Sequence, residues 1–177
     1  MADEQPEGAA NGGAAQGDAA QEATFTLHTQ YIKDMSVENP NAPRVFMEMK
    51  EAPEVSVNVD VGASPLQENT YEVRLDATVN AKSGDNTAFA IEVSYGGLVT
   101  LENVAENRQR EQLLLIQVPQ FLFPFVRAIV SGATRDAGFP PLLISPIDFV
   151  RLYRERRAQA EAEAAKNAES AQGAASA

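Results

Sequence analysis

The spacing of apolar residues changes once along this chain, and that change limits the folds open to it. Residues 24–31, 55–61, 71–79 and 87–95 alternate apolar and polar side chains with a period of two, which is typical of strands with one buried face. From Glu102 onward the period approaches 3.6, the value of an amphipathic helix. Strands followed by helices favour an α+β fold. We therefore predict a four-stranded antiparallel sheet followed by a long helix and a shorter C-terminal helix.

Turn residues set the details of the predicted sheet. Residues 83–86 (Ser-Gly-Asp-Asn) separate the third and fourth strands, so we expect these two strands to form a hairpin. Gly96 and Gly97 predict a bulge or bend near the end of the fourth strand. In the first strand, unbroken alternation predicts one shared face for Phe25, Leu27, Thr29 and Tyr31.

The first predicted helix is too apolar to be covered by one sheet alone. Pro119 is expected to open it, because proline is well tolerated in the first turn of a helix. Pro124 falls inside the pattern and predicts either a kink or the true start. Residues 113–130 carry a single charge, Arg127. A helix this apolar must be covered on more than one side, which predicts an oligomer. Its main stripe comprises Leu122, Val126, Ile129 and Val130.

A second helix and two tails complete the predicted organisation. Residues 145–148 (Ser-Pro-Ile-Asp) combine an N-cap, a first-turn proline and an acid, so they predict a helix start at Ser145. Residues 1–23 hold five acids and no base, and residues 158–177 hold ten alanines. Such segments lack the large apolar side chains that offset ordering entropy. We predict one domain over residues 24–157, a disordered acidic Ala/Gly-rich tail before it, and a fraying helix or a flexible Ala-rich arm after it.

Composition argues against several classes of function. The chain has 25 acidic and 14 basic residues, a formal charge of −11, and no cysteine. A strongly acidic chain without a basic stripe is a poor nucleic-acid binder. The one histidine, His28, lies in a strand without a local partner, so neither a Cys–His pair nor a multi-His metal site can form within one chain. We expect no catalytic residue, no metal and no cofactor, although an enzyme that pairs distant carboxylates stays open as an alternative.

The same reasoning applies to membranes. The longest charge-free stretch of the apolar region, residues 112–126, has fifteen residues. A membrane-spanning helix needs about 20. The first residues lack the basic and apolar regions of a signal peptide. We expect a soluble, cytoplasmic protein that does not insert into membranes.

Several large apolar side chains fall in predicted loops, where long apolar runs are uncommon. Two interpretations stay open. The loops fold back as lids over the core, or they line a groove for an extended, unfolded chain, a role that flexible Met and aromatic side chains suit. The side chains are Phe46, Met47, Met49, Phe139, Leu142, Leu143 and Ile144.

Four segments of the chain form a recognisable series. They are residues 31–46 (Tyr-Ile-Lys-Asp-Met-Ser-Val-Glu-Asn-Pro-Asn-Ala-Pro-Arg-Val-Phe) after the first strand, residues 71–75 with 87–97 in the hairpin, residues 122–127 in the long helix and residues 139–142 in the loop that follows it. In this order they resemble the signature, hairpin, helix start and connecting loop of the SecB family of bacterial protein-export chaperones, and the resemblance runs from about Phe25 to Tyr153. The resemblance implies a homotetramer, assembled as a dimer of dimers. It also implies a holdase that keeps unfolded secretory precursor proteins translocation-competent and passes them to the SecA ATPase.

The resemblance further implies roles for particular residues. SecA-binding positions match Asp34, Glu38, Ala90 and Glu92, where acids would attract a basic segment of the partner. Tetramer positions match Ile91, Val93 and Tyr95, which would press on Leu122, Val126 and Ile129 of the long helix. The client groove is assigned to Val55, Val57, Val59, Phe139, Leu142, Leu143, Phe149 and Leu152. The alternative within this family is a chaperone dedicated to a single client such as an antitoxin; the acids favour export.

Overall fold

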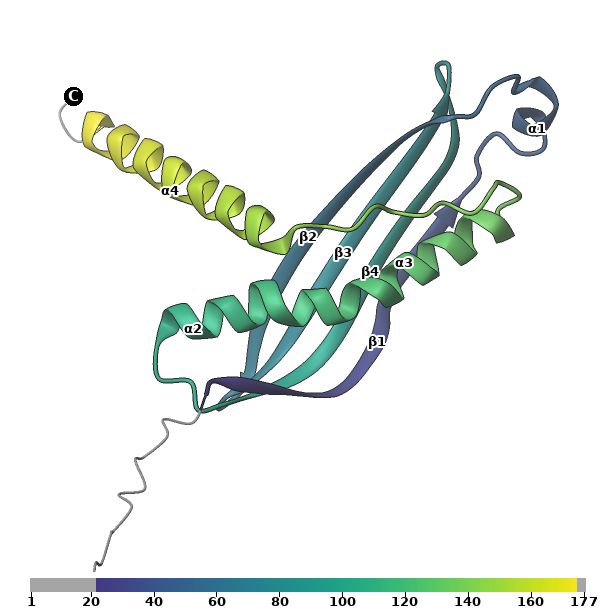
Figure 1. Cartoon of the computed structure of the whole chain (residues 1–177). Helices are drawn as coiled ribbons and strands as arrows, with labels where there is room; N and C mark the ends of the chain where they lie inside the picture. Colours follow the sequence, from purple (N-terminus) through teal and green to yellow (C-terminus); the bar gives the residue numbers. More distant parts are fainter. Residues whose placement is uncertain (1–21, 175–177) are drawn as a thin grey trace, which may run out of the picture.

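Four long antiparallel strands form a single sheet in the computed structural model, which describes residues 22–174 (Figure 1). The strands are β1 (Thr24–Glu38), β2 (Glu54–Gln67), β3 (Thr70–Ser83) and β4 (Asn86–Glu102), in the order β1-β4-β3-β2. This sheet and the β3–β4 hairpin confirm the α+β prediction. Gly84 in the hairpin turn has a φ of +59°, a conformation that glycine adopts without strain.

The helices follow the sheet, with the exception of the short α1 (Arg44–Glu48) between β1 and β2. The segments α2 (Asn107–Gln112), η1 (Leu113–Gln117, a π-helical turn) and α3 (Val118–Asp136) form one unbroken helix of 30 residues. The predicted start at Pro119 was therefore wrong, and Pro124 lies inside α3. The first turns escaped prediction because α2 is entirely polar and has no apolar period to detect.

The long helix lies across one face of the sheet, and the core fills the space between them (Figure 1). Within its apolar stripe, Ile129 is partly buried, and Leu122, Val126 and Val130 are fully buried. The facing strands contribute Val73, Leu75, Val79, Ile91 and Val99, which are equally inaccessible. We call this covered side of the sheet the inner face and the opposite side the outer face.

Strand β1 departs from the unbroken alternation that the sequence predicts. Its pairing with β4 shifts register between Leu27 and Thr29 and again between Ile32 and Asp34. Each shift inserts one extra residue, so the side chains that follow change face. Phe25 and Leu27 pack against the core, whereas Tyr31 bonds to a residue of the outer face. The single face predicted for residues 25–31 was therefore wrong.

Gly96 and Gly97 continue the regular β4 ladder, so the bulge predicted there was also wrong. The bulges lie in β1, on the neighbouring strand. A Cβ at Gly96 would lie 2.9 Å from the Tyr31 ring. A Cβ at Gly97 would lie 3.0 Å from Leu27 and 3.2 Å from Leu122. These glycines are required because side chains of other elements occupy the space on both faces.

Helix α4 (Phe149–Ala174) begins later than the sequence predicts. The carboxylate of Asp148 accepts a hydrogen bond from the backbone N–H of Arg151 at 3.0 Å, so Asp148, not Ser145, is the N-cap. The helix continues through residues 158–174, part of the predicted arm. The predicted disorder of residues 1–23 falls almost entirely outside the described residues.

The helix from Asn107 to Asp136 contains an 18-residue window with a mean hydropathy of 1.8, long and apolar enough to cross a bilayer by composition. Buried residues make up 44% of that window. Core helices of soluble proteins pass the same test, and packing against the sheet accounts for this buried part of the helix.

Candidate functional site

A groove runs between edge strand β2 and the segment that connects α3 to α4. It is an open cavity of about 540 Å³. Six of the eight residues predicted for a client groove line it: Val55, Val57, Val59, Leu142, Leu143 and Leu152. The structure adds Ile144, which the sequence analysis listed among the apolar loop residues, and Ile147 and Arg151, which it did not assign to a groove. Large apolar side chains remain accessible here; Val57 is 40% exposed and Leu143 is 65% exposed.

The two predicted aromatic residues lie beneath this surface. Phe139 is 4% exposed and Phe149 is 2% exposed. The Phe139 ring packs 4.7 Å from Phe89, and the Phe149 ring packs 5.9 Å from Phe123, centroid to centroid. Both phenylalanines therefore support the walls of the groove rather than line it, which corrects the predicted site.

Three polar contacts hold the connecting segment that forms one wall. The buried hydroxyl of Thr134 in α3 accepts a hydrogen bond from the backbone N–H of Leu142 at 2.9 Å. Asp148 caps α4, and the hydroxyl of Tyr153 donates to Glu111 of α2. This hydrogen bond to Glu111 raises the pKa of Tyr153 above its ordinary value. The segment is thus anchored at both ends, while Leu143 between them faces solvent.

The chemistry of the groove suits an extended apolar segment of another chain. Its valine and leucine side chains offer apolar area without a deep enclosed pocket, and contact with that area is non-directional. Such a surface discriminates poorly between apolar sequences. In the part of the chain that the structure describes, no group of three His, Cys, Asp or Glu residues could hold a metal ion.

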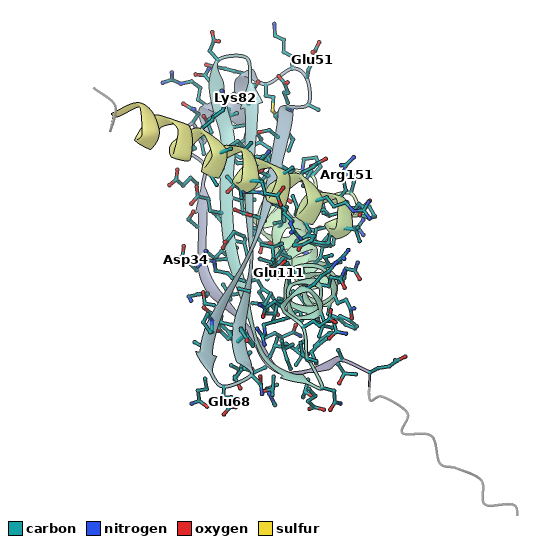
Figure 2. All side chains as sticks on the ribbon, turned by 90° about the vertical axis from the view of Figure 1, so that its left-hand side faces the viewer. Asp34, Glu51, Glu68, Lys82, Glu111 and Arg151 are labelled. Atoms are coloured by element: carbon teal, nitrogen blue, oxygen red, sulfur yellow. The ribbon has the colours of Figure 1, made fainter. Side chains whose placement is uncertain are left out.

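The four predicted SecA-binding residues share the outer face of β1 and β4. Glu38 pairs with Ala90, Ser36 pairs with Glu92, and Asp34 lies next along β1 on the same face. Figure 2 places Asp34 on the opposite side of the sheet from Glu111 of the helical layer. Across the described residues, Asp34, Glu38 and Glu92 form no ion pair. We call these three carboxylates, with Ala90, the acidic patch.

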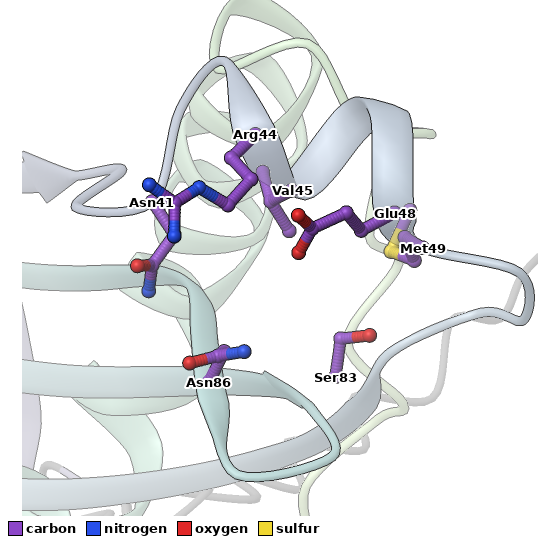
Figure 3. Close-up of a pocket in the computed structure, with 7 residues that line it drawn as sticks. All are labelled: Asn41, Arg44, Val45, Glu48, Met49, Ser83 and Asn86. Atoms are coloured by element: carbon purple, nitrogen blue, oxygen red, sulfur yellow. The ribbon is translucent and has the colours of Figure 1, made fainter.

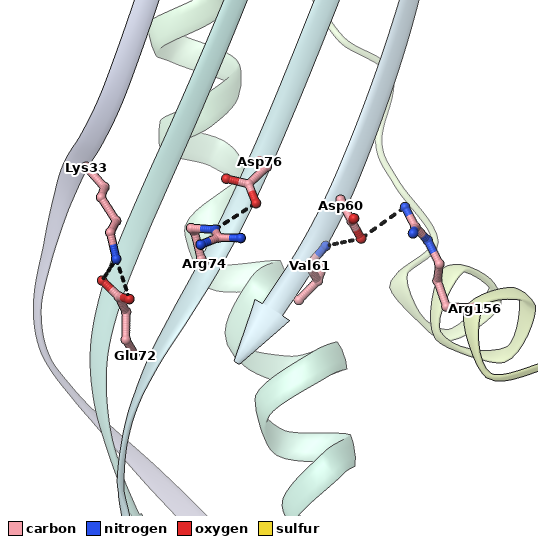
Figure 4. A network of polar contacts seen from close by, with 7 residues as sticks. All are labelled: Lys33, Asp60, Val61, Glu72, Arg74, Asp76 and Arg156. Carbon is pink, nitrogen blue, oxygen red and sulfur yellow. Dashed lines mark hydrogen bonds and ion pairs between the residues drawn. The ribbon is translucent and has the colours of Figure 1, made fainter. Parts of the chain in front are cut away.

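Farther along the same face, the charges neutralise one another (Figure 4). Lys33 of β1 contacts Glu72 of β3 at 2.6 Å, and Arg74 contacts Asp76 at 2.8 Å. Hydrogen bonds from Lys33 and from Tyr31 lower the pKa of Glu72 below its ordinary value. Asp60 of β2 pairs with Arg156 of α4 at 3.0 Å. The acidic patch is therefore a region of unbalanced negative charge beside a balanced one.

The residues predicted for a tetramer interface belong to the core of the single chain. Ile91, Val93, Tyr95, Leu122 and Val126 are buried between the sheet and α3, and Ile129 is partly buried. The sheet positions thus press on the α3 stripe within one chain, as the sequence analysis expected of these two sets of residues. The exposed aromatic residues of α3 are Phe121, 59% exposed, and Phe125, 44% exposed.

A smaller hollow of about 240 Å³ lies between α1 and the β3–β4 turn (Figure 3). Arg44 and Glu48 project from α1 on one side, and Ser83 and Asn86 lie on the other. The single histidine is elsewhere: the Nε2 atom of His28 lies 2.8 Å from the hydroxyl oxygen of Thr100, which agrees with a strand histidine bonded to a neighbour.

A family model and similar proteins of known name all relate this chain to one family. The sequence model of the family described as "Preprotein translocase subunit SecB" matches residues 18–160. The protein-export protein SecB of Rhodopseudomonas palustris is 41% identical over 152 residues, which cover 84% of this chain and 96% of that protein. That of Parvibaculum lavamentivorans is 45% identical over 150 residues, covering 85% and 87%.

Among solved structures, a SecB-like chaperone of Mycobacterium tuberculosis, in complex with a peptide from an antitoxin, shares the fold. The TM-score is 0.58 at 11% sequence identity, over 70% of this chain and 90% of that one. The match to the family over most of the chain and the identity to its members settle the relationship. The chain belongs to the SecB family.

Proposed function

We propose that this chain is an export chaperone that binds unfolded secretory precursor proteins in the groove along β2. The observation that carries the proposal is the exposed apolar lining of that groove, formed by Val55, Val57 and Leu143. Its relatives are named for protein export. A holdase needs no catalytic residue, because it acts by keeping apolar segments of a client from other contacts. Such a function belongs in the cytoplasm, where precursors are made.

The proposal includes delivery to the SecA ATPase through the acidic patch. Asp34, Glu38 and Glu92 lie on the outer face, whereas the groove borders the opposite side of β2. A basic segment of SecA would be attracted to these carboxylates, and the attraction would weaken with salt. Separate surfaces for client and partner allow both to bind at once.

The proposal also includes a homotetramer, a dimer of dimers. The rings of Phe121 and Phe125 contact Phe25 of β1 and Tyr95 of β4, yet both side chains stay exposed and give α3 an apolar surface that its own sheet does not cover. Clustered aromatic side chains on a surface are typical of interfaces between proteins. Covering this face with a second copy would satisfy the requirement, noted from the sequence, that the long helix be covered on more than one side.

Calorimetry with one secretory precursor tests the central claim. The precursor is titrated into the chaperone once in an unfolded state and once natively folded. We expect saturable binding of the unfolded form and none of the folded form, because only the unfolded chain exposes long apolar segments. Binding of neither form would contradict the holdase proposal and favour a chaperone dedicated to one client.

Replacing Glu92 with Lys should weaken SecA binding roughly tenfold at low ionic strength and less at high salt, since it reverses one charge at the centre of the acidic patch. The measurement is SecA affinity at two salt concentrations. Glu68→Lys is the matched control, because it makes the same charge change in the turn at the other end of the sheet (Figure 2). Unchanged affinity in Glu92→Lys would remove the patch from SecA docking.

A further inference from the structure

The two register shifts of β1 leave His28 and Lys33 without a partner in the backbone ladder. Both side chains are nevertheless held on the outer face. His28 contacts Thr100, and the Lys33 ammonium donates to the two carboxylate oxygens of Glu72 at 2.8 and 2.6 Å. Bulges of this kind set the direction of every side chain that follows them, because alternation resumes one residue later.

The bulge at Lys33 decides where the β1 carboxylates of the acidic patch lie. Beyond it, Asp34 pairs with Ser94 and Glu38 with Ala90 on the outer face, while Met35 pairs with buried Val93 on the inner face. If the bulge were lost, a one-residue slip would turn the carboxylates toward the core and the apolar side chains toward solvent.

The contact at Lys33 is part of a bridge from β1 to β3 over the strand between them (Figure 4). The Tyr31 hydroxyl also donates to Glu72, at 2.6 Å. The bridge is possible because Gly96 of β4 has no side chain; a Cβ there would lie 2.9 Å from the Tyr31 ring. The Glu72 side chain is only 14% exposed, so its hydrogen bonds are better shielded from water than those of a surface pair.

We propose that Tyr31, Lys33 and Glu72 act as a register clamp: positioning residues that fix the bulge at Lys33 and thereby keep Asp34 and Glu38 on the docking face. The clamp makes no contact with the partner itself. The inference rests on the proposed docking of SecA at the acidic patch and adds the residues that orient it.

Electrostatics alone predicts the opposite effect of removing Lys33. Deleting any cation from this face makes it more negative and should strengthen the binding of a basic partner. Arg74 provides the matched control, since it forms an ion pair with Asp76 on the same face, its exposure resembles that of Lys33 (45% against 43%), and it lies outside β1. The register clamp and electrostatics alone therefore predict changes of opposite sign in SecA affinity when Lys33 is replaced by an uncharged residue.

The test compares Lys33→Met, Lys33→Arg and Arg74→Met in the full chain. SecA affinity is measured by calorimetry, and backbone amide exchange is measured over residues 34–38. We expect Lys33→Met to bind SecA roughly three- to tenfold more weakly and to exchange faster over residues 34–38. Arg74→Met should bind at least as tightly as the unmodified chain, and Lys33→Arg, which keeps the cation, should retain binding.

Equal or tighter binding by Lys33→Met, with unchanged amide exchange, would overturn the clamp. If the unmodified chain does not bind SecA, the docking proposal fails instead. The exchange comparison between Lys33→Met and Arg74→Met then still decides whether Lys33 holds this part of β1. Circular dichroism of each variant separates these outcomes from loss of folding. If Lys33→Met does not fold, Tyr31→Phe carries the test, because it removes the hydrogen bond that the Tyr31 hydroxyl donates to Glu72 without changing the charge: weaker SecA binding and faster exchange over residues 34–38 are expected, and unchanged values of both would overturn the clamp.

Discussion

Replacing Val57 with Asp should weaken the capture of an unfolded precursor at least about tenfold while the assembly stays intact. Val57 lines the groove, and a carboxylate there would have to lose water when an apolar client segment covers it. Since Val57 is 40% exposed before any client binds, the substitution buries little charge in the free protein. The free energy of unfolding should therefore change by less than about 1 kcal/mol. Calorimetric titration with an unfolded precursor measures the loss.

The matched control is Ser56→Asp. Ser56 precedes Val57 in β2, pairs with Asn80 of β3 and lies on the opposite face of the strand. It adds the same charge to the same strand without lining the groove. If both variants bind clients equally, charge on β2 in general sets the affinity and Val57 has no special place in the groove.

The sequence predicted the sheet well because alternation, turns and proline positions are local signals. The same alternation predicted that Glu92 would face away from Ile91, and the structure agrees, since Ile91 is buried while Glu92 is exposed. What it could not predict is which face of the sheet each side chain of β1 occupies after the first register shift. The bulges at His28 and Lys33 arise from pairing with β4 and from hydrogen bonds to Thr100 and Glu72, which lie far along the chain.

Burial of the groove residues shows a second limit. Phe139 and Leu142 belong to one apolar run in the sequence, yet Phe139 is buried against Phe89 whereas Leu142 lines the cavity. Hydrophobicity identified the run, but only the tertiary position of each side chain shows which residues line the groove and which are buried beneath that lining. The polar first turns of the long helix were invisible for a related reason, because a solvated turn has no apolar period.

Leu122 and Phe121 are neighbours in α3 for which opposite effects are expected. Leu122→Ala should lower the free energy of unfolding by about 2–5 kcal/mol, because the side chain is fully buried between the sheet and the helix and its removal leaves a cavity. Phe121→Ala should change it much less, since Phe121 is 59% exposed and its ring contact is the edge of Phe25, 5.4 Å away. Denaturant unfolding at one fixed protein concentration measures both values.

The association of copies of this chain should depend on Phe121 more than on Leu122, the reverse of the order expected for stability. Phe121→Ala removes an exposed aromatic side chain from the face proposed for a second copy, so the proposed tetramer should dissociate at a higher protein concentration in this variant than in the unmodified chain. Sedimentation of both variants over a range of concentrations measures this. If Leu122→Ala keeps its free energy of unfolding but sediments as a smaller assembly, Leu122 lies between chains, as the family resemblance implied. A stability loss confined to Leu122→Ala, with assembly loss confined to Phe121→Ala, would divide α3 into a face for its own sheet and a face for another copy.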